Sequence, residues 1–465
     1  MLEFFFQPKS IAVIGASSDS RSVGFGLLKN LISGGTLYSD WRKPFDGKIW
    51  AVNPKASWIL NQRCYPSISA VPEPVDLAII AVPAATVPKV LEQCGRKKVK
   101  AVIVISSGFA ETGPTGARAQ ARLLGLCRRY RMRMLGPNCL GLIRPGIGLN
   151  ASFAPTMPPP GAVCLISQSG ALIDSAIDWA LASRYGFSAL ISVGNAADIG
   201  FPELLRWAGQ NSESRAIALY LESVPNGREL MAAISEVVAS KAVVALKAGR
   251  TEPAGRAIST HIGSIASPWR VYDAALRQSG AQLAQSFEQL FDLAKALAFQ
   301  RPCANSIAIV SNGGGAGVLA ADACAALGLK LVQLKAATIS RLEGTRVMHP
   351  AWSRANPVDL VGDALPERYA AALDVLLAEP GIAGLIVIQT LQTVTDSAGN
   401  ARVLREAAAA HPEKAVIAAF MGGSYTAEAA QTLEAAGIPN YPDPARAAAA
   451  MAALVRRFEW LERHR

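Results

Sequence analysis

Short apolar runs rich in Val, Ile and Ala alternate along this chain with longer amphipathic stretches rich in Ala and Leu. A buried strand followed by an amphipathic helix is the repeating unit of parallel α/β sheets, so the pattern predicts βαβ architecture throughout. The expected strands fall into three successive sets. They cover 10–15, 48–52, 77–82, 101–106 and 132–135, then 162–167, 188–193, 216–222 and 242–247, and finally 306–311, 329–334, 384–389 and 415–420.

Two breaks in this pattern divide the chain. Residues 146–160 lose the periodicity and end in consecutive prolines, which predicts a linker, and Pro302 interrupts a second short segment, 301–305. A length of 465 residues corresponds to about three domains. Helices are expected over 269–278, over 286–300 and from Pro444 onward. We therefore expect α/β domains at 1–145, 146–300 and 303–465.

The composition excludes several classes of protein. With 51% hydrophobic and 17% charged residues the chain is not disordered and can bury several cores. No apolar run reaches the roughly 18 residues of a membrane span, and the N-terminus lacks the features of a signal peptide, so we expect a cytoplasmic protein without a membrane partner. The seven cysteines form no CxxC pair, which argues against a disulfide framework and structural zinc, and no metal site is predicted. The net charge of +11 is diffuse, fits a polyanionic small ligand and does not by itself imply nucleic acid.

Small residues follow the first strand, where Gly15, Ser17 and Gly24 allow backbone amides to approach an anion at a helix N-terminus. The loop does not match the dinucleotide fingerprint GxGxxG. The second strand ends in Asn53-Pro54-Lys55, at a place where an NAD site carries an acidic residue. A lysine there suits a phosphorylated ribose, as found in NADP and in coenzyme A.

Two further loops have the same form, a strand followed by small polar residues and a helix. They are Ser167–Gly170 and Ser311–Gly317. Two helix dipoles aimed at one point would stabilise a phosphoryl group, which predicts a phosphate-handling site. The candidate phosphate-binding residues are Ser167, Gln168, Ser169, Gly170, Gly313, Gly314 and Gly315.

One histidine differs from the other three, which lie in loops or in the basic tail. His261 stands in a Gly- and Ser-rich segment between a strand and a helix, a setting that suits a nucleophile or a proton carrier. Glu222 ends an apolar strand, and a carboxylate at the carboxyl end of a parallel strand faces the ligand crevice. Glu222 is therefore a candidate to orient a histidine and to support its charged form.

Together these segments resemble a known family. The chain is similar to the α subunit of NDP-forming acyl-CoA synthetases, the ADP-forming acetate–CoA ligases related to succinyl-CoA synthetase, over almost its whole length. The resemblance implies a Rossmann-type CoA-binding domain followed by two flavodoxin-like domains. It is carried by PKSIAVIGAS, VNPK, PVDLAIIAVPA, SSGFAE, GPNCLG, SQSGAL, YLES, the histidine loop, SNGGGAG and NPVDL.

The resemblance also implies roles for particular residues. His261 carries phosphate as phosphohistidine, Glu222 supports it, and the two helix N-termini hold the phosphoryl group. The family usually has His-Thr-Gly-Ser-x-Ala-Gly around this histidine, whereas this chain has Ile262 and Ser267. The implied residues for CoA or acyl-CoA are Gly15, Ser17, Arg21, Gly24, Asn53, Lys55, Val82, Pro83, Ser107, Gly108, Phe109 and Asn138.

The reaction implied by the resemblance is acyl-CoA + ADP + phosphate ⇌ carboxylate + CoA + ATP, the reaction of an ADP-forming acid–thiol ligase. The chain contains neither a P-loop nor an ATP-grasp module. We therefore expect an ATP-grasp β subunit that binds ADP or ATP with Mg, in a hetero-oligomer such as α2β2.

Two other functions fit parts of the sequence. A non-catalytic CoA- or acyl-CoA-binding protein with a regulatory or scaffold role would explain the altered histidine motif. An NADP-dependent oxidoreductase would use the first domain and leave the second and third loops unexplained. The sequence does not identify the acyl group.

Overall fold

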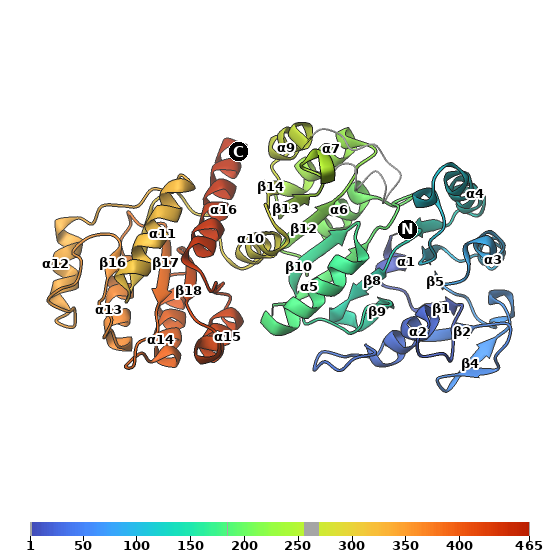
Figure 1. Ribbon diagram of the computed structural model, residues 1–465, viewed down its shortest axis with the longest axis horizontal. Coiled ribbons are helices and arrows are strands. Elements are labelled where there is room, and N and C mark those ends of the chain that lie inside the picture. The colour runs from blue at the N-terminus through green and yellow to red at the C-terminus, as the bar shows by residue number, and fades with distance from the viewer. Residues whose placement is uncertain (1, 184, 255–268, 465) are drawn as a thin grey trace. The chain divides into compact units, whose positions relative to one another are not determined.

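The computed structural model describes residues 2–183, 185–254 and 269–464 (Figure 1). The expected α/β fold is confirmed, with the strands of the described chain gathered into three sheets. The chain divides into two compact units, Met1–Ala284 and Gln285–Arg465, and each is described by itself. None of the helices in the described part is long and apolar enough to cross a membrane.

The first sheet has the strand order β3-β4-β2-β1-β5-β6-β7 and is parallel apart from the β3–β4 hairpin. Every residue of β1 is buried, as expected for a parallel strand with helices on both faces. The order reverses beside β1, whose neighbours are β2 and β5, and ligands of such sheets bind at the carboxyl ends of the strands at this point. The strands are β1 (Ser10–Ile14), β2 (Lys48–Val52), β3 (Trp58–Ile59), β4 (Gln62–Tyr65), β5 (Leu77–Ile80), β6 (Ala101–Val104) and β7 (Arg133–Leu135), and the helices are α1 (Glu3–Phe6), α2 (Val23–Ser33), α3 (Val87–Arg96) and α4 (Pro114–Tyr130).

The second sheet has the order β14-β13-β12-β10-β11-β8-β9. In its parallel part the strand order again reverses, here at β10, which pairs with β11 on one side and with β12 on the other. The strands are β8 (Gly141–Arg144), β9 (Leu149–Ser152), β10 (Pro160–Ser167), β11 (Phe187–Ser192), β12 (Ala216–Leu221), β13 (Ala242–Lys247) and β14 (Gln282–Leu283), and the helices are α5 (Gly170–Ser183), α6 (Phe201–Gln210), α7 (Gly227–Val238) and α9 (Trp269–Gln278).

The linker prediction for 146–160 is wrong, because this segment contains β9 and the start of β10. All four residues of β9 are buried, although two of them are polar. Asn30 of α2 donates hydrogen bonds from Nδ2 to the carbonyls of Ser152 (2.8 Å) and Ala154 (2.7 Å). The segment therefore forms an antiparallel hairpin with β8, and the side chain of Asn30, distant in sequence, adds hydrogen bonds where the strand ends.

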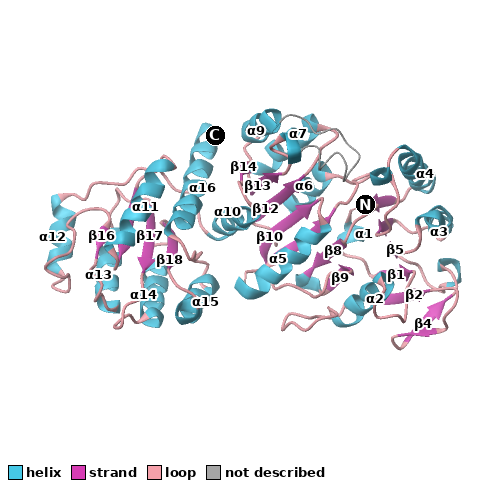
Figure 2. Cartoon of the chain, viewed as in Figure 1, coloured by secondary structure: helices cyan, strands magenta, loops and turns pink. Residues whose placement is uncertain are grey.

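The third sheet is parallel throughout, with the order β16-β15-β17-β18. Helices α11 and α16 pack against each other, and so do α13 and α14, so that the sheet is sandwiched between helices (Figure 2). The strands are β15 (Ile307–Ser311), β16 (Val358–Asp359), β17 (Gly384–Gln389) and β18 (Ala415–Phe420), and the helices are α10 (Phe287–Phe299), α11 (Gly314–Ala326), α12 (Ala336–Gly344), α13 (Pro366–Leu377), α14 (Ser397–Ala410), α15 (Ala427–Ala435) and α16 (Pro444–Arg463).

The strand expected at 329–334 is also wrong, since only a single bridge forms there, between Leu331 and Ile307. The free edge of β15 is shared, because β16 pairs with its other end at Val310 and Ser311. The side chain of Asn356 fills the gap between the two segments: its Oδ1 accepts from the Ile309 amide at 2.9 Å.

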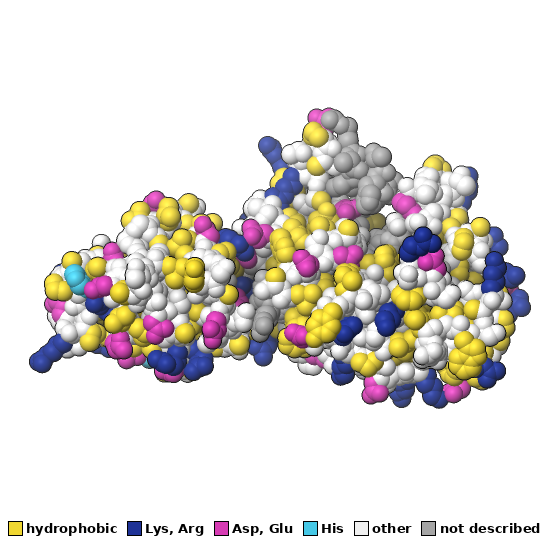
Figure 3. Space-filling view, turned by 60° about the horizontal axis from the view of Figure 1, so that its bottom comes forward, with side chains coloured by type: hydrophobic (Ala, Val, Ile, Leu, Met, Phe, Trp, Pro, Cys, Tyr) yellow, Lys and Arg dark blue, Asp and Glu magenta, His cyan; other side chains and the backbone are white. Residues whose placement is uncertain are grey.

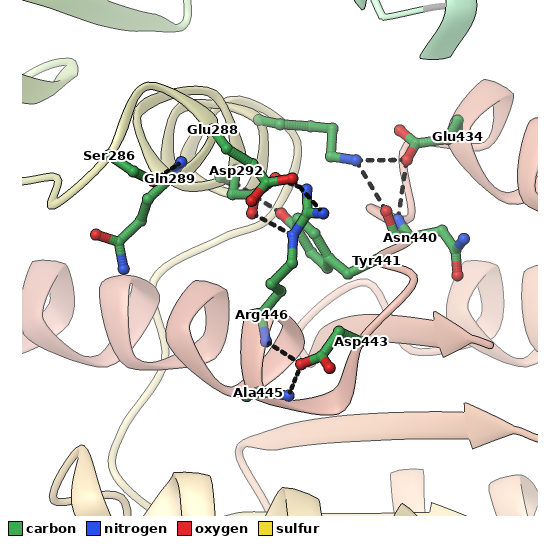
Figure 4. A network of polar contacts seen from close by, with 11 residues as sticks. Ser286, Glu288, Gln289, Asp292, Glu434, Asn440, Tyr441, Asp443, Ala445 and Arg446 are labelled. Carbon is green, nitrogen blue, oxygen red and sulfur yellow. Dashed lines mark hydrogen bonds and ion pairs between the residues drawn. The ribbon is translucent and has the colours of Figure 1, made fainter. Parts of the chain in front are cut away.

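The helix expected at 286–300 is confirmed as α10, and polar contacts join it to the second unit (Figure 4). Asp292 receives two hydrogen bonds from the guanidinium of Arg446, at 2.7 and 2.8 Å. Lys295 forms an ion pair with Glu434 at 2.6 Å, and the Tyr441 hydroxyl donates to the Asp292 carbonyl at 2.7 Å. Because Asp292 and Lys295 are both 7% exposed, their partners are required to offset the desolvation of these charges.

Candidate functional site

The first candidate loop lies where the order of the first sheet reverses. Gly15 follows β1 with φ +97°, and a Cβ at this position would stand 2.2 Å from the carbonyl oxygen of Ala81, which follows β5. A Cβ on Gly24 would stand 1.9 Å from the carbonyl oxygen of Gly15. Glycine is therefore required at both positions, because the start of α2, the end of β1 and the end of β5 are in backbone contact.

Asn53 connects this loop to the end of β2. Its Nδ2 donates to the Ala16 carbonyl at 2.8 Å, and its Oδ1 accepts from the Lys55 amide at the same distance. Lys55 is exposed beside the first loop, as a residue for a phosphorylated ribose has to be. Arg21 is exposed as well, and its Nε lies 3.3 Å from Oδ1 of Asp19, a carboxylate in the loop that sequence reasoning did not single out.

The loops after β5, β6 and β7 are also tied together. The Ser106 hydroxyl donates to the Val82 carbonyl, and the Asn138 amide donates to the Ser106 carbonyl at 3.0 Å. Oε1 of Glu111 accepts from the amides of Gly108 (2.5 Å) and Phe109 (3.1 Å). This arrangement orients three of the five loops expected to bind CoA.

Glu111 is a positioning residue that sequence reasoning missed, although it belongs to the segment SSGFAE. Burial opposes its ionisation, but hydrogen bonds from the Asn195 side chain and from the amides of Phe109 and Gly108 outweigh burial and lower the pKa of the carboxyl. The Asn195 bond, 2.6 Å long, comes from the loop after β11 in the second sheet. The only sign of Glu111 in the sequence was an acidic residue three positions after Gly108.

A cavity of about 600 Å³ opens between these loops and the start of α5, a size typical of a small-molecule site. Its wall includes Val82, Pro83, Ser107 and Asn138 from the expected CoA-binding residues, and Gly170 from the expected phosphate-binding residues. The structure therefore brings members of two separately predicted sets to one cavity within the first unit.

The loop after β10 reaches the neighbouring strand β12 through Gln168. Its Oε1 accepts from the amides of Glu222 (2.6 Å) and Ser223 (3.0 Å). The Ser167 hydroxyl, fully buried, donates to the Ser169 carbonyl at 2.8 Å and accepts from the Ser169 amide at 3.1 Å. Gln168 and Ser167 thus use their side chains to shape the loop that precedes α5 and to bring Glu222 beside it.

A buried cationic group lies near Glu222. Lys247 ends β13, is 2% exposed, and places its Nζ 4.5 Å from the centre of the Tyr272 ring. Burial lowers the pKa of Lys247 to about 8, while the charge of Glu222 acts in the opposite direction. Burial, together with the charge of Glu222 and a hydrogen bond to it, raises the pKa of Tyr220 to about 12. Sequence reasoning missed Lys247, although a single lysine at the end of an otherwise apolar strand could have indicated it.

His261 lies outside the described residues, in 255–268. Its proximity to Glu222 therefore stays a prediction.

The loop of the second unit repeats the geometry of the loop before α5. The Ser311 hydroxyl donates to the Gly313 carbonyl at 2.9 Å and accepts from the Gly313 amide at 3.0 Å. Asn312 takes the place of Gln168, since its Oδ1 accepts from the amide of Thr390, which follows the neighbouring strand β17, at 2.7 Å. The repeat expected between the second and third sets of strands thus extends to individual hydrogen bonds.

One acidic residue distinguishes the second-unit loop. A Cβ on Gly314 would stand 2.8 Å from Oδ2 of Asp359, so the start of α11 already faces a carboxylate. The positions of the two units relative to one another are not determined, and the meeting of the two loops at one phosphoryl group stays a prediction.

The surface charge is mixed, as the sequence indicated. Basic and acidic side chains are interspersed over the face drawn in Figure 3.

These loops can be tested through Lys55. Lys55→Ala is expected to weaken CoA binding about 5- to 150-fold, the effect of losing a charge-assisted hydrogen bond to phosphate. Isothermal calorimetry with CoA measures it. Lys100→Ala is the matched control, because Lys100 is exposed just before β6, at the opposite edge of the same sheet. Equal effects of the two substitutions would contradict a specific role for Lys55.

The order of the first sheet and the cavity at the carboxyl ends of its strands define a protein that binds a small molecule there. Three family models match the chain: a CoA binding domain at residues 9–145, a succinyl-CoA ligase like flavodoxin domain at 160–297, and a ligase-CoA domain at 307–464. The chain is 40% identical to the acetate–CoA ligase (ADP-forming) I subunit alpha of Pyrococcus furiosus, over all of this chain and 99% of that protein.

A longer relative and a solved structure place the chain in the same family. The chain is 39% identical to the acetate–CoA ligase (ADP-forming) I of Archaeoglobus fulgidus over 98% of this chain, but spans only 63% of that protein. A solved dinucleotide-forming acetyl-coenzyme A synthetase 1 from Candidatus Korarchaeum cryptofilum, in complex with phosphate and ADP, superposes with a TM-score of 0.92 at 35% identity, covering 100% of this chain and 99% of that one. The chain belongs to the family of ADP-forming acetate–CoA ligases and corresponds to their α subunit.

Proposed function

We propose that the chain is the α part of an ADP-forming acyl-CoA synthetase, which catalyses acyl-CoA + ADP + phosphate ⇌ carboxylate + CoA + ATP. The observation that carries the proposal is the cavity whose wall combines the expected CoA loops with the start of α5. A thioester held by those loops and a phosphate held at a helix N-terminus would meet there. The names of the relatives support the same reaction and favour it over a purely regulatory or scaffold role.

The first step joins phosphate to the acyl group. A phosphate oxygen attacks the thioester carbonyl carbon, the C–S bond breaks, and CoA leaves as the thiolate. Backbone amides at the start of α5, oriented by Ser167, would stabilise the phosphate. The product is an acyl phosphate.

The second step moves the phosphoryl group to the protein. A ring nitrogen of His261 attacks phosphorus, the bond to the acyl oxygen breaks, and the carboxylate leaves. Glu222, held by Gln168 and close enough to Lys247 for their charges to interact, would accept a hydrogen bond from the other ring nitrogen and fix the tautomer. The phosphoryl group then passes from the histidine to the terminal oxygen of ADP.

We also propose that an ATP-grasp β subunit supplies the site for ADP or ATP with Mg, in a hetero-oligomer such as α2β2. The name "subunit alpha", carried by a relative that the chain matches end to end, supports a partner. The three domains proposed from the sequence, at 1–145, 146–300 and 303–465, would carry the CoA site and the two phosphate loops, one in each. A cytoplasmic location also stays a prediction.

The test is reconstitution. The purified chain is expected to form no ATP from acetyl-CoA, ADP and phosphate, and to form it once an ATP-grasp partner is added, because the phosphate loops and the nucleotide site lie on different chains. A coupled luciferase assay measures the ATP. ATP formation by the chain alone would contradict the proposed partner, and its absence with an authentic partner would contradict the proposed reaction.

A further inference from the structure

One acidic side chain in the cavity has no role in the steps above. Asp174 lies one helical turn beyond the start of α5, and Gly170, Ala171 and Asp174 all line the cavity. Their spacing of three and four residues places them on one face of the helix. Gly170 is one of the predicted phosphate-binding residues, and Asp174 lies about 6 Å farther along the helix axis, at a rise of 1.5 Å per residue.

The described surroundings of Asp174 leave one of its carboxylate oxygens without a partner. Oδ1 of Asp174 is buried and has no hydrogen-bond partner among the described residues. The described residues that line the cavity include no lysine, arginine or histidine, and its wall near α5 also contains the apolar side chains Leu140 and Phe153. Burial raises the pKa of Asp174 to about 6, so the carboxyl is mostly ionised at neutral pH.

A buried carboxylate oxygen without a donor costs free energy in the unliganded protein. Such a cost is typical of binding sites, where the ligand supplies the missing partner. Asp174 lines the cavity, so a molecule bound there can donate a hydrogen bond to its carboxylate. The thioester end of CoA is expected to lie near the start of α5, so the part of the ligand that reaches Asp174 is the acyl chain.

We propose that Asp174 determines acyl specificity by accepting a hydrogen bond from a donor group on a short acyl chain, such as a hydroxyl. The inference rests on the proposed function, because it takes the cavity to hold the acyl end of acyl-CoA. The substrate class is then a short hydroxyacyl-CoA rather than a plain alkanoyl-CoA. An acyl chain bearing an ammonium group offers the same donor chemistry, and the experiment distinguishes the two.

The experiment measures binding of CoA thioesters to the full chain by calorimetry at neutral pH. The probes are CoA, butyryl-CoA, 3-hydroxybutyryl-CoA and β-alanyl-CoA. Wild type is expected to bind 3-hydroxybutyryl-CoA at least about 10-fold more tightly than butyryl-CoA. A site that accepts a hydrogen bond from a substrate hydroxyl rejects an analogue that lacks the hydroxyl. A preference for β-alanyl-CoA over 3-hydroxybutyryl-CoA would overturn the hydroxyl assignment in favour of an ammonium.

Two substitutions separate recognition from folding. Asp174→Leu, close in size and apolar, is expected to bring the ratio of the two dissociation constants to about 1 or below, to leave binding of CoA itself unchanged, and to raise the melting temperature because an unpaired buried oxygen is removed. Asp178→Asn is the matched control, one turn farther along α5 and exposed, and is expected to keep the wild-type ratio.

The outcomes distinguish the two proposals. If wild type binds both thioesters equally, or if Asp174→Leu keeps the wild-type ratio, the inference about Asp174 fails and the proposed function stands. If the chain binds neither CoA nor any thioester, the proposed function itself fails. Should Asp174→Leu not fold, Asp174→Asn tests the same ratio, and is expected to reduce it at least about threefold because a neutral acceptor forms the weaker hydrogen bond.

Discussion

His261→Ala is expected to abolish phosphorylation of the chain and all ATP formation in the reconstituted enzyme. A neutral imidazole is a competent nucleophile near pH 7, whereas serine and lysine need strong activation, and the sequence around His261 retains the small residues Gly263 and Ser264. Loss of a covalent nucleophile reduces turnover by at least about 10⁴-fold. The measurement is incorporation of radiolabelled phosphate from acetyl-CoA plus phosphate, or from ATP with the partner, together with the rate of ATP synthesis.

The controls for this experiment lie on the same chain. The label on wild type is expected to be acid-labile and base-stable, as a phosphoramidate is. His411→Ala is the matched control, because His411 lies beside Glu413 in a loop after α14. This substitution is expected to leave labelling unchanged. Binding of CoA to His261→Ala is expected to equal wild type, since the CoA loops belong to the first sheet. A wild-type chain that never acquires label beside an authentic partner would favour the regulatory alternative.

Gly15→Ala is expected to eliminate measurable CoA binding, a loss of more than about 100-fold. Its φ of +97° disfavours any side chain, and the new Cβ would stand 2.2 Å from the Ala81 carbonyl oxygen. The strained conformation alone costs about 1–3 kcal/mol, and relieving the clash requires the end of β1 to move away from the end of β5. Because those two ends form the edge at which the CoA loops meet, the site would open. Calorimetry with CoA measures the loss.

Thermal unfolding shows whether this effect is local. Gly125→Ala is the matched control: Gly125 lies within α4, and a Cβ there meets nothing within 4 Å. Alanine favours a helix interior over glycine by about 1 kcal/mol, so Gly125→Ala is expected to bind CoA normally and to unfold at a slightly higher temperature. If Gly15→Ala binds CoA as wild type does, the contact between β1 and β5 is not part of the CoA site.

The sequence was sufficient wherever the signal is local. Fully buried parallel strands appear as continuous apolar runs, and this is why the expected strands 242–247, 384–389 and 415–420 coincide with β13, β17 and β18. Glycines and serines directly after such strands identified the loops at Gly15, Ser167 and Ser311. The motif resemblance added the family, which the matches over the whole chain confirm.

Long-range partners explain the errors. Residues 329–334 are apolar enough for a strand, but Val358 and Asp359 pair with the same edge of β15 and leave room for only one bridge. Residues 149–152 look like a linker, yet they pair with β8, and the side chain of Asn30 in α2 donates to the Ser152 carbonyl. The competing segment in the first case and the buried amide in the second are distant in the sequence, so the pattern of each segment alone does not reveal them.

By itself, therefore, the sequence determined the α/β class, the approximate positions of most strands and the small-residue loops predicted to bind anions, because each depends on the residues of one strand and the turn after it. Only the tertiary structure decided which side chains stand together. Glu111 holds the CoA loop, Lys247 lies near Glu222, and Asp174 stands unpaired in the cavity. These roles arise from burial and hydrogen bonding between loops that follow different strands, and such contacts exist only after the sheets have assembled.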